Sequence, residues 1–462
     1  MPVRFRIENP TLAGPLRQIE QLIRRAGGRT WLVGGCIRDL VLGRQPRDLD
    51  LEISGLPPGR LHALLTEQFS VQFVGKVFCV FKLQGLPVDI SIPSRMLTDD
   101  ASVPGLLKES DPDMDMDIDE ALARRDFTMN AMAWDPDTLE LRDPFSGRAD
   151  LDAHVLRHAS DCFRGDPLRV LRGMQLAARF GLTAAPETVA LCKTLTQDEQ
   201  PSERLWEEWK ALLLQGITPS LGLQFLSDCG WLRFYPELAA LQGCEQDPIW
   251  HPEGDVWSHT LHCLDWFAME RTGKQDDDLI VGLGILCHDF GKPATTTTDF
   301  GRITSRGHEP EGEAPTRRFL ERLTNQDDLI NEVIPLVLCH LRPRALHDAN
   351  ASDNAVRRLA RQVKRIDRLV RVARADHAGR PPRTFDGFPA GEWLLNKARQ
   401  LEVEDQAPTP IVMGRHLVEM GVSPGPDMGR LLDDCYEAQL DGMFSTLEAG
   451  LTYAKTKLSS LS

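Results

Sequence analysis

Two aspartates that stand one residue apart, Asp48 and Asp50, follow a glycine pair and an arginine in the run Gly34-Gly35-Cys36-Ile37-Arg38. Side chains at positions i and i+2 of an extended segment point to the same side of a sheet, so the two carboxylates would lie together. Mg²⁺ takes such hard oxygen ligands, and metal ions can stabilise the attacking and leaving oxygens of a phosphoryl transfer. The glycines would let backbone N–H groups approach phosphates, and Arg38 would offset phosphate charge. The pattern predicts a nucleotide site.

A third carboxylate is expected from a neighbouring strand of the same sheet. Asp89, in the run Pro87-Val88-Asp89-Ile90-Ser91, fits that place, and it fits an ordinary exposed strand position about equally well. An Asp-x-Asp pair by itself is common at solvated strand edges. The prediction therefore depends on the glycines and the arginine that precede the pair.

Two further motifs follow the first in a fixed order. They are Arg124-Arg125-Asp126-Phe127-Thr128-Met129-Asn130-Ala131 and Gly165-Asp166-Pro167-Leu168-Arg169-Val170-Leu171-Arg172. With the Asp48/Asp50 segment, they resemble the class II tRNA nucleotidyltransferases, which are the CCA-adding enzymes and bacterial poly(A) polymerases of the polymerase-β-like superfamily. The resemblance covers roughly residues 29 to 385 and matches the C-terminal remainder weakly.

The resemblance implies template-independent addition of C and A from CTP and ATP to the 3′ end of tRNA, with Mg²⁺ and release of pyrophosphate. It implies that Asp48 and Asp50 hold the Mg²⁺, with Asp89 as the candidate third catalytic carboxylate. The residues that it places at the nucleotide are Gly35, Arg38, Arg125, Asp166, Arg169 and Arg172. An Asp acceptor and an Arg donor can satisfy the edge of C or A and would leave groups of G or U unpaired, at about 1–3 kcal/mol each. The plainer alternative for Arg169 and Arg172 is a salt bridge to Asp166 or Glu203.

Two departures from the family pattern leave the product open. The family usually has a glutamate before Asp166, where this chain has Gly165, and close relatives have a glycine-rich loop where residues 96–118 are acidic here. Both positions bear on the choice among full CCA, CC-only, A-only and poly(A) addition. Two other classes stay open as alternatives: a phosphohydrolase whose head only binds RNA, and a non-catalytic RNA-binding protein.

A second constellation lies in the later half of the chain. His259, the adjacent pair His288-Asp289 and the distant Asp376 are residue types that can bind a divalent transition metal from separate helices. They resemble the HD-domain phosphohydrolases, including the HD domain of some bacterial CCA enzymes. That resemblance implies Ni²⁺, Mn²⁺ or Mg²⁺ and hydrolysis of 2′-phosphates or 2′,3′-cyclic phosphates. A metal-free helical domain that retains the pattern is the alternative.

Three neighbouring residues have plainer interpretations. His308 and His340 could be extra metal ligands, but each reads more simply as a lone surface or packed histidine. Lys292 could stabilise developing charge, and we interpret it as a surface lysine.

A small sheet with surrounding helices must position these residues. The spacing predicts a helix over residues 10–26, a strand over 30–34 that stops at the glycine pair, and a helix over 36–42. Alternating apolar residues predict a strand over 49–53, with further strand runs over 71–83 and 86–92. Beyond about residue 150 the apolar spacing is helical, at 169–180, 202–214 and 220–229 and over most of 256–377.

We therefore predict an α+β fold: a polymerase-β-like nucleotidyltransferase head with a small sheet, then an all-α neck and an HD-type helical domain. A chain of 462 residues is too long for one core. The predicted parts are the head over 1–150, a neck that binds the nucleotide base and RNA over 151–247, the HD-type domain over 248–380 and a helical C-terminal segment over 381–462.

Composition sets further expectations. A formal charge of −15 argues against a generic polyanion binder, although local patches decide individual contacts. The basic residues of one amphipathic helix over 356–373, Arg357, Arg361, Lys364, Arg368 and Arg371, form either a solvated face or a contact for RNA phosphates. Ten cysteines without a Cys-x-x-Cys pair, no signal peptide and no membrane-spanning stretch predict a cytoplasmic protein with reduced thiols.

Overall fold

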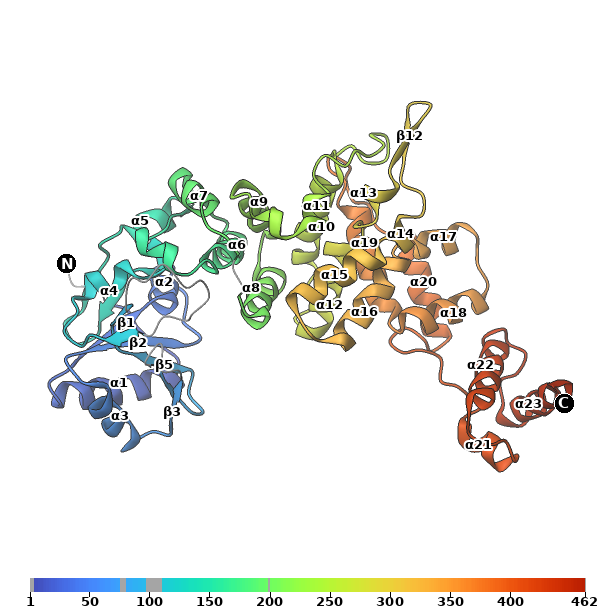
Figure 1. The fold of residues 1–462 in the computed structure, drawn as a ribbon, viewed down its shortest axis with the longest axis horizontal. Helices are drawn as coiled ribbons and strands as arrows, with labels where there is room; N and C mark the ends of the chain where they lie inside the picture. The colour runs from blue at the N-terminus through green and yellow to red at the C-terminus, as the bar shows by residue number, and fades with distance from the viewer. Residues whose placement is uncertain (1–3, 75–79, 97–109, 198–199, 462) are drawn as a thin grey trace. The chain divides into compact units, whose positions relative to one another are not determined.

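The computed structural model describes residues 4–74, 80–96, 110–197 and 200–461. The chain forms two compact units, Met1–Phe234 and Tyr235–Ser462, drawn from blue to green and from green to red in Figure 1. The four predicted parts are a finer division than this, and their boundaries stay predictions. Among the described residues, no helix is both long and apolar enough to cross a membrane.

The first unit is built on a mixed sheet whose described strands have the order β3-β4-β5-β2-β1-β8-β9. At its centre β1 (Arg29–Val33) pairs antiparallel with β2 (Leu49–Ser54), and β2 runs parallel to β5 (Val88–Ser91). The outer strands are β3 (Val71–Val74), β4 (Val80–Leu83), β8 (Ala133–Asp135) and β9 (Glu140–Arg142). The strand run predicted over 71–83 is two antiparallel strands, with residues 75–79 outside the described part.

Helices cover both faces of this sheet. On one side α1 (Pro10–Arg25) packs with α3 (Pro58–Thr66), as Figure 1 shows. On the other side Trp31 and Val33 of β1 form a buried cluster with Leu122 of α4 (Ile118–Ala123). Both faces of β1 are buried, so a slip of one residue would be costly and the strand end at Val33 is fixed. The glycine turn and α2 (Gly35–Val41) start from that fixed point.

Three helices of the same unit match their predicted spans closely: α6 (Arg169–Phe180), α8 (Ser202–Gln215) and α9 (Pro219–Asp228). α6 packs against both of the others. A Cβ atom at Gly222 would lie 2.5 Å from the Met174 carbonyl oxygen, so glycine is what allows α9 to approach α6 this closely. The contact fixes the helix that carries Arg169 and Arg172.

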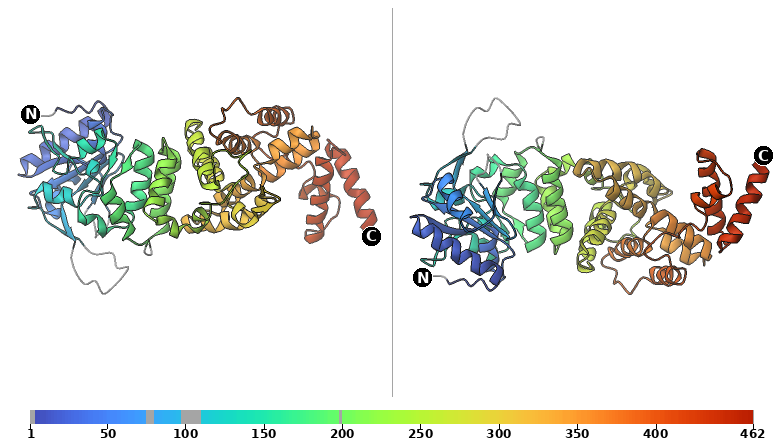
Figure 2. Two further views of the ribbon diagram at one scale, coloured as in Figure 1. Left: turned by 90° about the horizontal axis from the view of Figure 1, so that it is seen from above. Right: turned by 90° about the horizontal axis from the view of Figure 1, so that it is seen from below.

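The second unit is helical, as predicted. α12 (Gln275–Cys287) is buried along most of its length and packs against α11 (Val256–Met269), α16 (Asp327–Cys339) and α19 (Ile366–Ala378), in the group of helices seen in Figure 2. A hairpin of β12 (Thr297–Asp299) and β13 (Arg302–Thr304), which the sequence did not indicate, interrupts the helical block. The predicted end of the HD-type domain at residue 380 lies between α19 and α20 (Pro389–Gln400).

The single basic helix predicted over 356–373 is wrong. α18 (Asp353–Val363) ends before Lys364, whose φ is +59°, and α19 begins at Ile366. Three of its basic residues pair with acids of the same unit: Arg361 with Asp433 and Glu437, Arg368 with Asp277 and Glu332, and Arg371 with Asp278. Because these arginines are neutralised internally, the prediction that this face contacts RNA phosphates loses its support.

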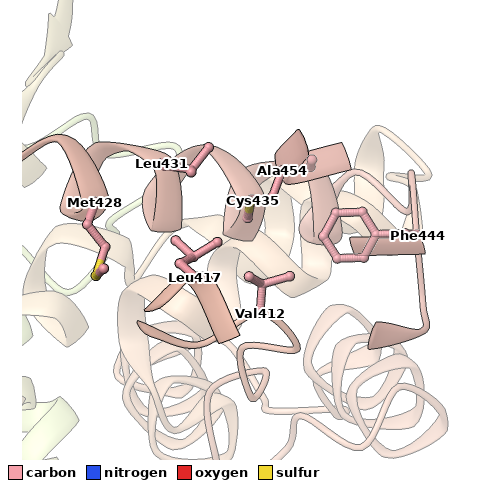
Figure 3. Packing of buried hydrophobic residues seen from close by; sticks show 8 residues of the cluster. Val412, Leu417, Met428, Leu431, Cys435, Phe444 and Ala454 are labelled. Carbon is pink, nitrogen blue, oxygen red and sulfur yellow. The ribbon is translucent and has the colours of Figure 1, made fainter. Parts of the chain in front are cut away.

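The C-terminal segment is helical and has a small core of its own. It comprises α21 (Gly414–Glu419), α22 (Pro426–Leu440) and α23 (Leu447–Leu461). Figure 3 shows its buried side chains gathered from all three helices and the adjoining loops: Val412, Leu417, Met428, Leu431, Cys435, Phe444 and Ala454.

Candidate functional site

Three carboxylates lie together at the centre of the sheet. In the parallel pair of β2 and β5, Asp50 stands directly opposite Asp89, and Asp48 precedes the first residue of β2. Burial raises the pKa of Asp50, and the charges of Asp48 and Asp89 raise it further, whereas the Arg125 guanidinium lowers it. Asp89 also forms an ion pair with Lys82 at 3.1 Å. The structure thus brings Asp89 to the place where a third carboxylate was expected.

The glycine turn lets an arginine approach these acids. Gly34 has a φ of +73°, and a Cβ atom there would lie 2.8 Å from Arg125 Nη1 and 3.2 Å from Asp50 Oδ2. Any other residue would be strained in this conformation and would clash with Arg125. Arg125 Nη2 also pairs with Glu52 Oε2 of β2 at 3.2 Å. The turn thus joins Gly34, Asp50 and Arg125 at one wall of a cleft.

A chain of polar contacts connects the three sequence motifs. Arg38 Nη1 donates to Asn130 Oδ1 at 2.9 Å, and Asn130 Nδ2 donates to Asp126 Oδ1 at 3.0 Å. Asp126 Oδ2 in turn pairs with Arg172 Nη1 at 3.2 Å. Burial would raise the pKa of Asp126, but the Arg172 charge and the Asn130 hydrogen bond hold it below its ordinary value. Asp126 therefore stays a charged acceptor that orients Arg172.

The third motif has an arrangement that sequence reasoning did not give. Asp166 Oδ2 pairs with Arg204 Nη2 of α8 at 2.8 Å. Arg169 donates to the backbone carbonyls of Arg124 at 2.5 Å and Cys162 at 2.9 Å. Neither Arg169 nor Arg172 pairs with Asp166 or Glu203 among the ion pairs of the described residues. Arg169 instead ties the third motif to the second, and its contact with a nucleotide stays a prediction.

Side chains from all three sequence motifs line one cleft of the first unit. Its lining includes every predicted nucleotide contact: Gly35, Arg38, Arg125, Asp166, Arg169 and Arg172. Asp50 lines it as well, together with Asn130, Gln175 and Arg179, which the sequence did not single out. Six arginines and three aspartates line the cleft, which makes it locally basic in a chain of net charge −15. This arrangement is suited to a polyanionic ligand beside a metal-binding acid group.

The acidic loop expected over residues 96–118 cannot be compared with the family along its whole length, because residues 97–109 lie outside the described part. Its end is ordered around α4, where Asp117 caps the helix and Asp119 pairs with Arg142.

The second predicted constellation is brought together in the second unit. His259 Nε2 lies 3.1 Å from Asp376 Oδ1, and His288 Nε2 lies 3.1 Å from Asp289 Oδ2. His259 and Asp289 are 3.9 Å apart, which links the two pairs. The four residues come from α11, the end of α12 and α19, and all are buried. Separate helices therefore supply them, as predicted.

His308 and His340 belong to the same cluster, so the prediction that they are lone histidines is wrong. His308 Nε2 lies 3.2 Å from His340 Nε2 and 3.5 Å from Asp289 Oδ1. Burial and the charge of the neighbouring His288 together lower the pKa of His340 to about 3. The sequence did not show this because single histidines on α14 (His308–Glu311) and at the end of α16 carry no spacing signal.

The ring orientations fit a bound cation. The Nδ1 atoms of His288, His308 and His340 each lie 2.7–2.8 Å from a backbone carbonyl, and His259 Nδ1 lies 2.7 Å from Glu253 Oε1. An Nδ1–H that donates outward leaves the Nε2 lone pair free to bind metal. His288 Nε2 and both Asp289 oxygens are fully buried, and in the described structure they make ionic contacts with one another, with Lys292 and with His308. A divalent transition metal would bind these atoms as its ligands.

Sequence reasoning missed several residues around this cluster. Lys292 is buried and lies 2.7 Å from Asp289 Oδ2, so its interpretation as a surface lysine is wrong. Glu253 bridges His251 and His259. Burial would raise the pKa of Glu253, but the hydrogen bonds to these two histidines bring it down to about 2. The sequence analysis did not single out either His251 or Glu253. His251 and Glu253 two residues apart were the available signal.

Comparison with known proteins identifies the family. Residues 30–157 match the family model for the poly A polymerase head domain. The chain is 35% identical over 374 residues to the multifunctional CCA protein of Laribacter hongkongensis, covering 78% of this chain and 87% of that protein. This chain belongs to the multifunctional CCA protein family. The multifunctional CCA protein of Xanthomonas oryzae is 32% identical over 422 residues, covering 87% of this chain and 96% of its own. The predicted family and the enzyme class, a tRNA nucleotidyltransferase, are confirmed.

Solved structures of CCA-adding enzymes share the fold. The Bacillus stearothermophilus CCA-adding enzyme in complex with CTP has a TM-score of 0.63 at 20% identity, covering 98% of this chain and 100% of that one. The Thermotoga maritima CCA-adding enzyme complexed with tRNA has a TM-score of 0.57 at 19% identity, covering 98% and 97%. At this identity the likeness shows the fold, and it confirms the predicted head with a small sheet followed by helices.

Proposed function

We propose that this member of the multifunctional CCA protein family adds C and A nucleotides to the 3′ end of tRNA from CTP and ATP without a template. The observation that carries the proposal is the cleft in which Asp50, backed by Asp48 and Asp89, faces a wall of arginines from all three motifs. We place the reaction in the cytoplasm, where tRNA and both nucleotides are present.

The chain's own residues would divide the work of one transfer step. The triphosphate lies against the Gly34-Gly35 turn, with Arg38 and Arg125 offsetting its charge. Asp166 and Arg169 face the base, so C and A find partners and other bases leave groups unsatisfied. The tRNA 3′-hydroxyl then attacks the α-phosphate in line, and pyrophosphate leaves.

The acid group fits a hard divalent cation, and we propose Mg²⁺ held by Asp48 and Asp50, with Asp89 as the third carboxylate. Carboxylate oxygens are preferred ligands of Mg²⁺. When bound, the ion supplies charge stabilisation for the attacking and leaving oxygens. Arg125 beside Asp50 favours the anionic form of that carboxylate, because its charge opposes the rise in pKa that burial causes.

One experiment tests the activity and sorts the alternatives. Purified protein is given three tRNAs that end before CCA, after C and after CC, with CTP, ATP or both. Addition of CCA, C-A and A respectively supports the proposal. Incorporation of only C, only A or a long A tail identifies the CC-adding, A-adding or poly(A) alternative, and no incorporation contradicts the proposal.

Asp48→Ala should reduce incorporation on the order of 10³-fold, because losing a metal ligand removes several kcal/mol of transition-state stabilisation. Labelled CTP incorporation on the tRNA that ends before CCA measures the effect. Asp152→Ala, at an exposed position of α5 (Gly147–Asp152), is the matched control and should behave as wild type. Wild-type rates in Asp48→Ala would remove Asp48 from the metal site.

The buried histidine cluster favours a second activity, metal-dependent hydrolysis of 2′,3′-cyclic or 2′-phosphates. The buried convergence of His259, His288, Asp289, His308 and His340 carries this candidate. Ni²⁺, Mn²⁺ or Mg²⁺ suits a mixed set of imidazoles and carboxylates, and would supply an activated water and a Lewis acid. Lys292 is positioned beside Asp289 to offset charge on a phosphate.

His288→Ala should remove hydrolysis of 2′,3′-cyclic AMP and lower the metal content of the purified protein, while nucleotide transfer continues. His262→Ala, at an exposed position of the same unit, is the control for removing a histidine. Hydrolysis is measured with each of the three metals, and after chelation. If wild-type protein binds no metal and hydrolyses nothing, the cluster is structural.

A further inference from the structure

Three arginines surround a single aromatic ring beside the nucleotide cleft. The guanidinium carbons of Arg38, Arg179 and Arg44 lie 4.5, 5.0 and 5.7 Å from the centre of the Phe180 ring. Arg38 comes from α2, Arg44 follows the end of that helix, and Arg179 and Phe180 end α6. The ring thus collects positive groups from two segments that are far apart in the sequence.

Most arginines in and around the cleft have a carboxylate beside them. Arg125, Arg172 and Arg204 each pair with a carboxylate. Arg38 pairs with Asp39 at 2.8 Å. Among the described residues, neither Arg44 nor Arg179 forms an ion pair, and the same is true of Arg47, which directly precedes Asp48.

The charges of Arg44, Arg47 and Arg38 all act on Arg179. Burial lowers the pKa of Arg179, and the charge of Arg38 lowers it further. Asp39 raises this pKa, and Arg47 and Arg44 lower it by smaller amounts. Arg38 and Arg179 both line the nucleotide cleft, so the excess charge borders the same space as the Gly34-Gly35 turn. A group of four arginines beside the counter-charge of Asp39 is costly for folding alone, and an anionic ligand would lower that cost.

We propose that Arg44, Arg47 and Arg179, next to Arg38, form a phosphate-binding site at the rim of the nucleotide cleft. The site rests on the proposed function, because the cleft is where phosphate groups gather in that reaction. Guanidinium groups bind phosphate oxygens through paired N–H donors. Arg38, Arg44 and Arg179 lie around the Phe180 ring, which helps to hold their positions. Two phosphate sources fit: the terminal phosphates of the nucleotide, which leave as pyrophosphate, and the backbone of the RNA acceptor.

Equilibrium binding to the full-length protein tests the site without requiring turnover. Arg44→Gln and Arg179→Gln are compared with Arg60→Gln, which removes an exposed arginine of α3 outside the lining of this cleft. The probes are pyrophosphate, CTP and a tRNA that ends before CCA. Loss of one charge-assisted contact should weaken the affected ligand about tenfold. Thermal unfolding should show no loss of stability, because each change relieves repulsion.

Each outcome decides the proposal or its source. Weaker pyrophosphate and CTP binding with unchanged tRNA binding assigns the site to the nucleotide phosphates. Weaker tRNA binding, with a slope of log K against log salt reduced by about 1 per arginine, assigns it to the RNA backbone. If neither variant differs from Arg60→Gln for any probe, the site is overturned. If the wild type binds these probes but transfers no nucleotide, the proposed function fails while the phosphate site stands.

Discussion

Asp166, which the proposed function places at the nucleotide base, is paired with Arg204. The family pattern has a glutamate before this aspartate, and Gly165 cannot supply a carboxylate. Arg204, from the neighbouring helix α8, pairs with Asp166 Oδ2 at 2.8 Å, and the other oxygen accepts from the Leu168 backbone N–H. Both oxygens are thereby oriented. We infer that Arg204 is a positioning residue that holds Asp166 in the absence of the glutamate.

Arg204→Ala should release Asp166 and weaken discrimination between CTP or ATP and the other two nucleotides by about tenfold, because one oriented hydrogen bond contributes about 1–3 kcal/mol to it. The ratio of kcat/KM for CTP to that for UTP measures the change. Glu207→Ala, an exposed change on the same helix, is the control.

Adding Gly165→Glu to Arg204→Ala gives a readout that a general loss of folding would not reproduce. Restored discrimination supports the positioning role. Unchanged discrimination in Arg204→Ala itself would show that Asp166 is held by other contacts.

At the scale of single residues, much of the transferase site was readable from the sequence. Asp48, Asp50 and the motif arginines were identifiable because their types are needed within short segments. Arg204 and Arg179 were not, because each acts on a residue from another part of the chain and has no local pattern. His308 and His340 were misread for the same reason.

At the scale of the elements, a close backbone contact at Gly291 holds together the helices that carry the histidine cluster. A Cβ atom at Gly291 would lie 2.0 Å from the His308 carbonyl oxygen and 2.7 Å from the Gly312 backbone nitrogen. Only glycine lets the turn after Asp289 pack against α14. The distance between Asp289 and His308 therefore depends on this one position.

Gly291→Ala should destabilise the second unit by about 1–3 kcal/mol, the usual cost of inserting a methyl group into a tightly packed site. It should also lower metal content, because α14 must move with His308. Urea unfolding and metal analysis measure the two effects. Gly429→Ala, inside α22 where a Cβ atom meets nothing within 4 Å, is the control and should preserve both. Full stability in Gly291→Ala would contradict the packing argument.

The elements also show where periodicity succeeds and where it fails. α6 has the predicted bounds, 169–180, since its apolar spacing and Gly181 mark both ends. The helix predicted over 356–373 has a compatible apolar stripe throughout, yet the chain breaks at Lys364. The stripe continues because α18 and α19 both pack in the same unit, so periodicity alone could not distinguish one helix from two.

Across the whole molecule, the two compact units separate the two candidate chemistries. The nucleotide cleft lies entirely within the first unit, and the histidine cluster entirely within the second. Each site is complete within its own core. This separation is the reason that we expect Asp48→Ala and His288→Ala to act on one activity each.

The sequence by itself determined the family, the order of the three motifs, the Asp48/Asp50 pair and the four HD-type residues, because short-range chemistry and helical spacing are written locally. Only the tertiary structure decided what surrounds them. It placed Asp89 opposite Asp50, brought His308 and His340 to Asp289 and paired Asp166 with Arg204. Around Phe180 it gathered Arg44 and Arg179, which form no ion pair with any described residue. Packing of sheets and helices sets these distances, and it joins residues whose separation along the chain carries no periodic signal.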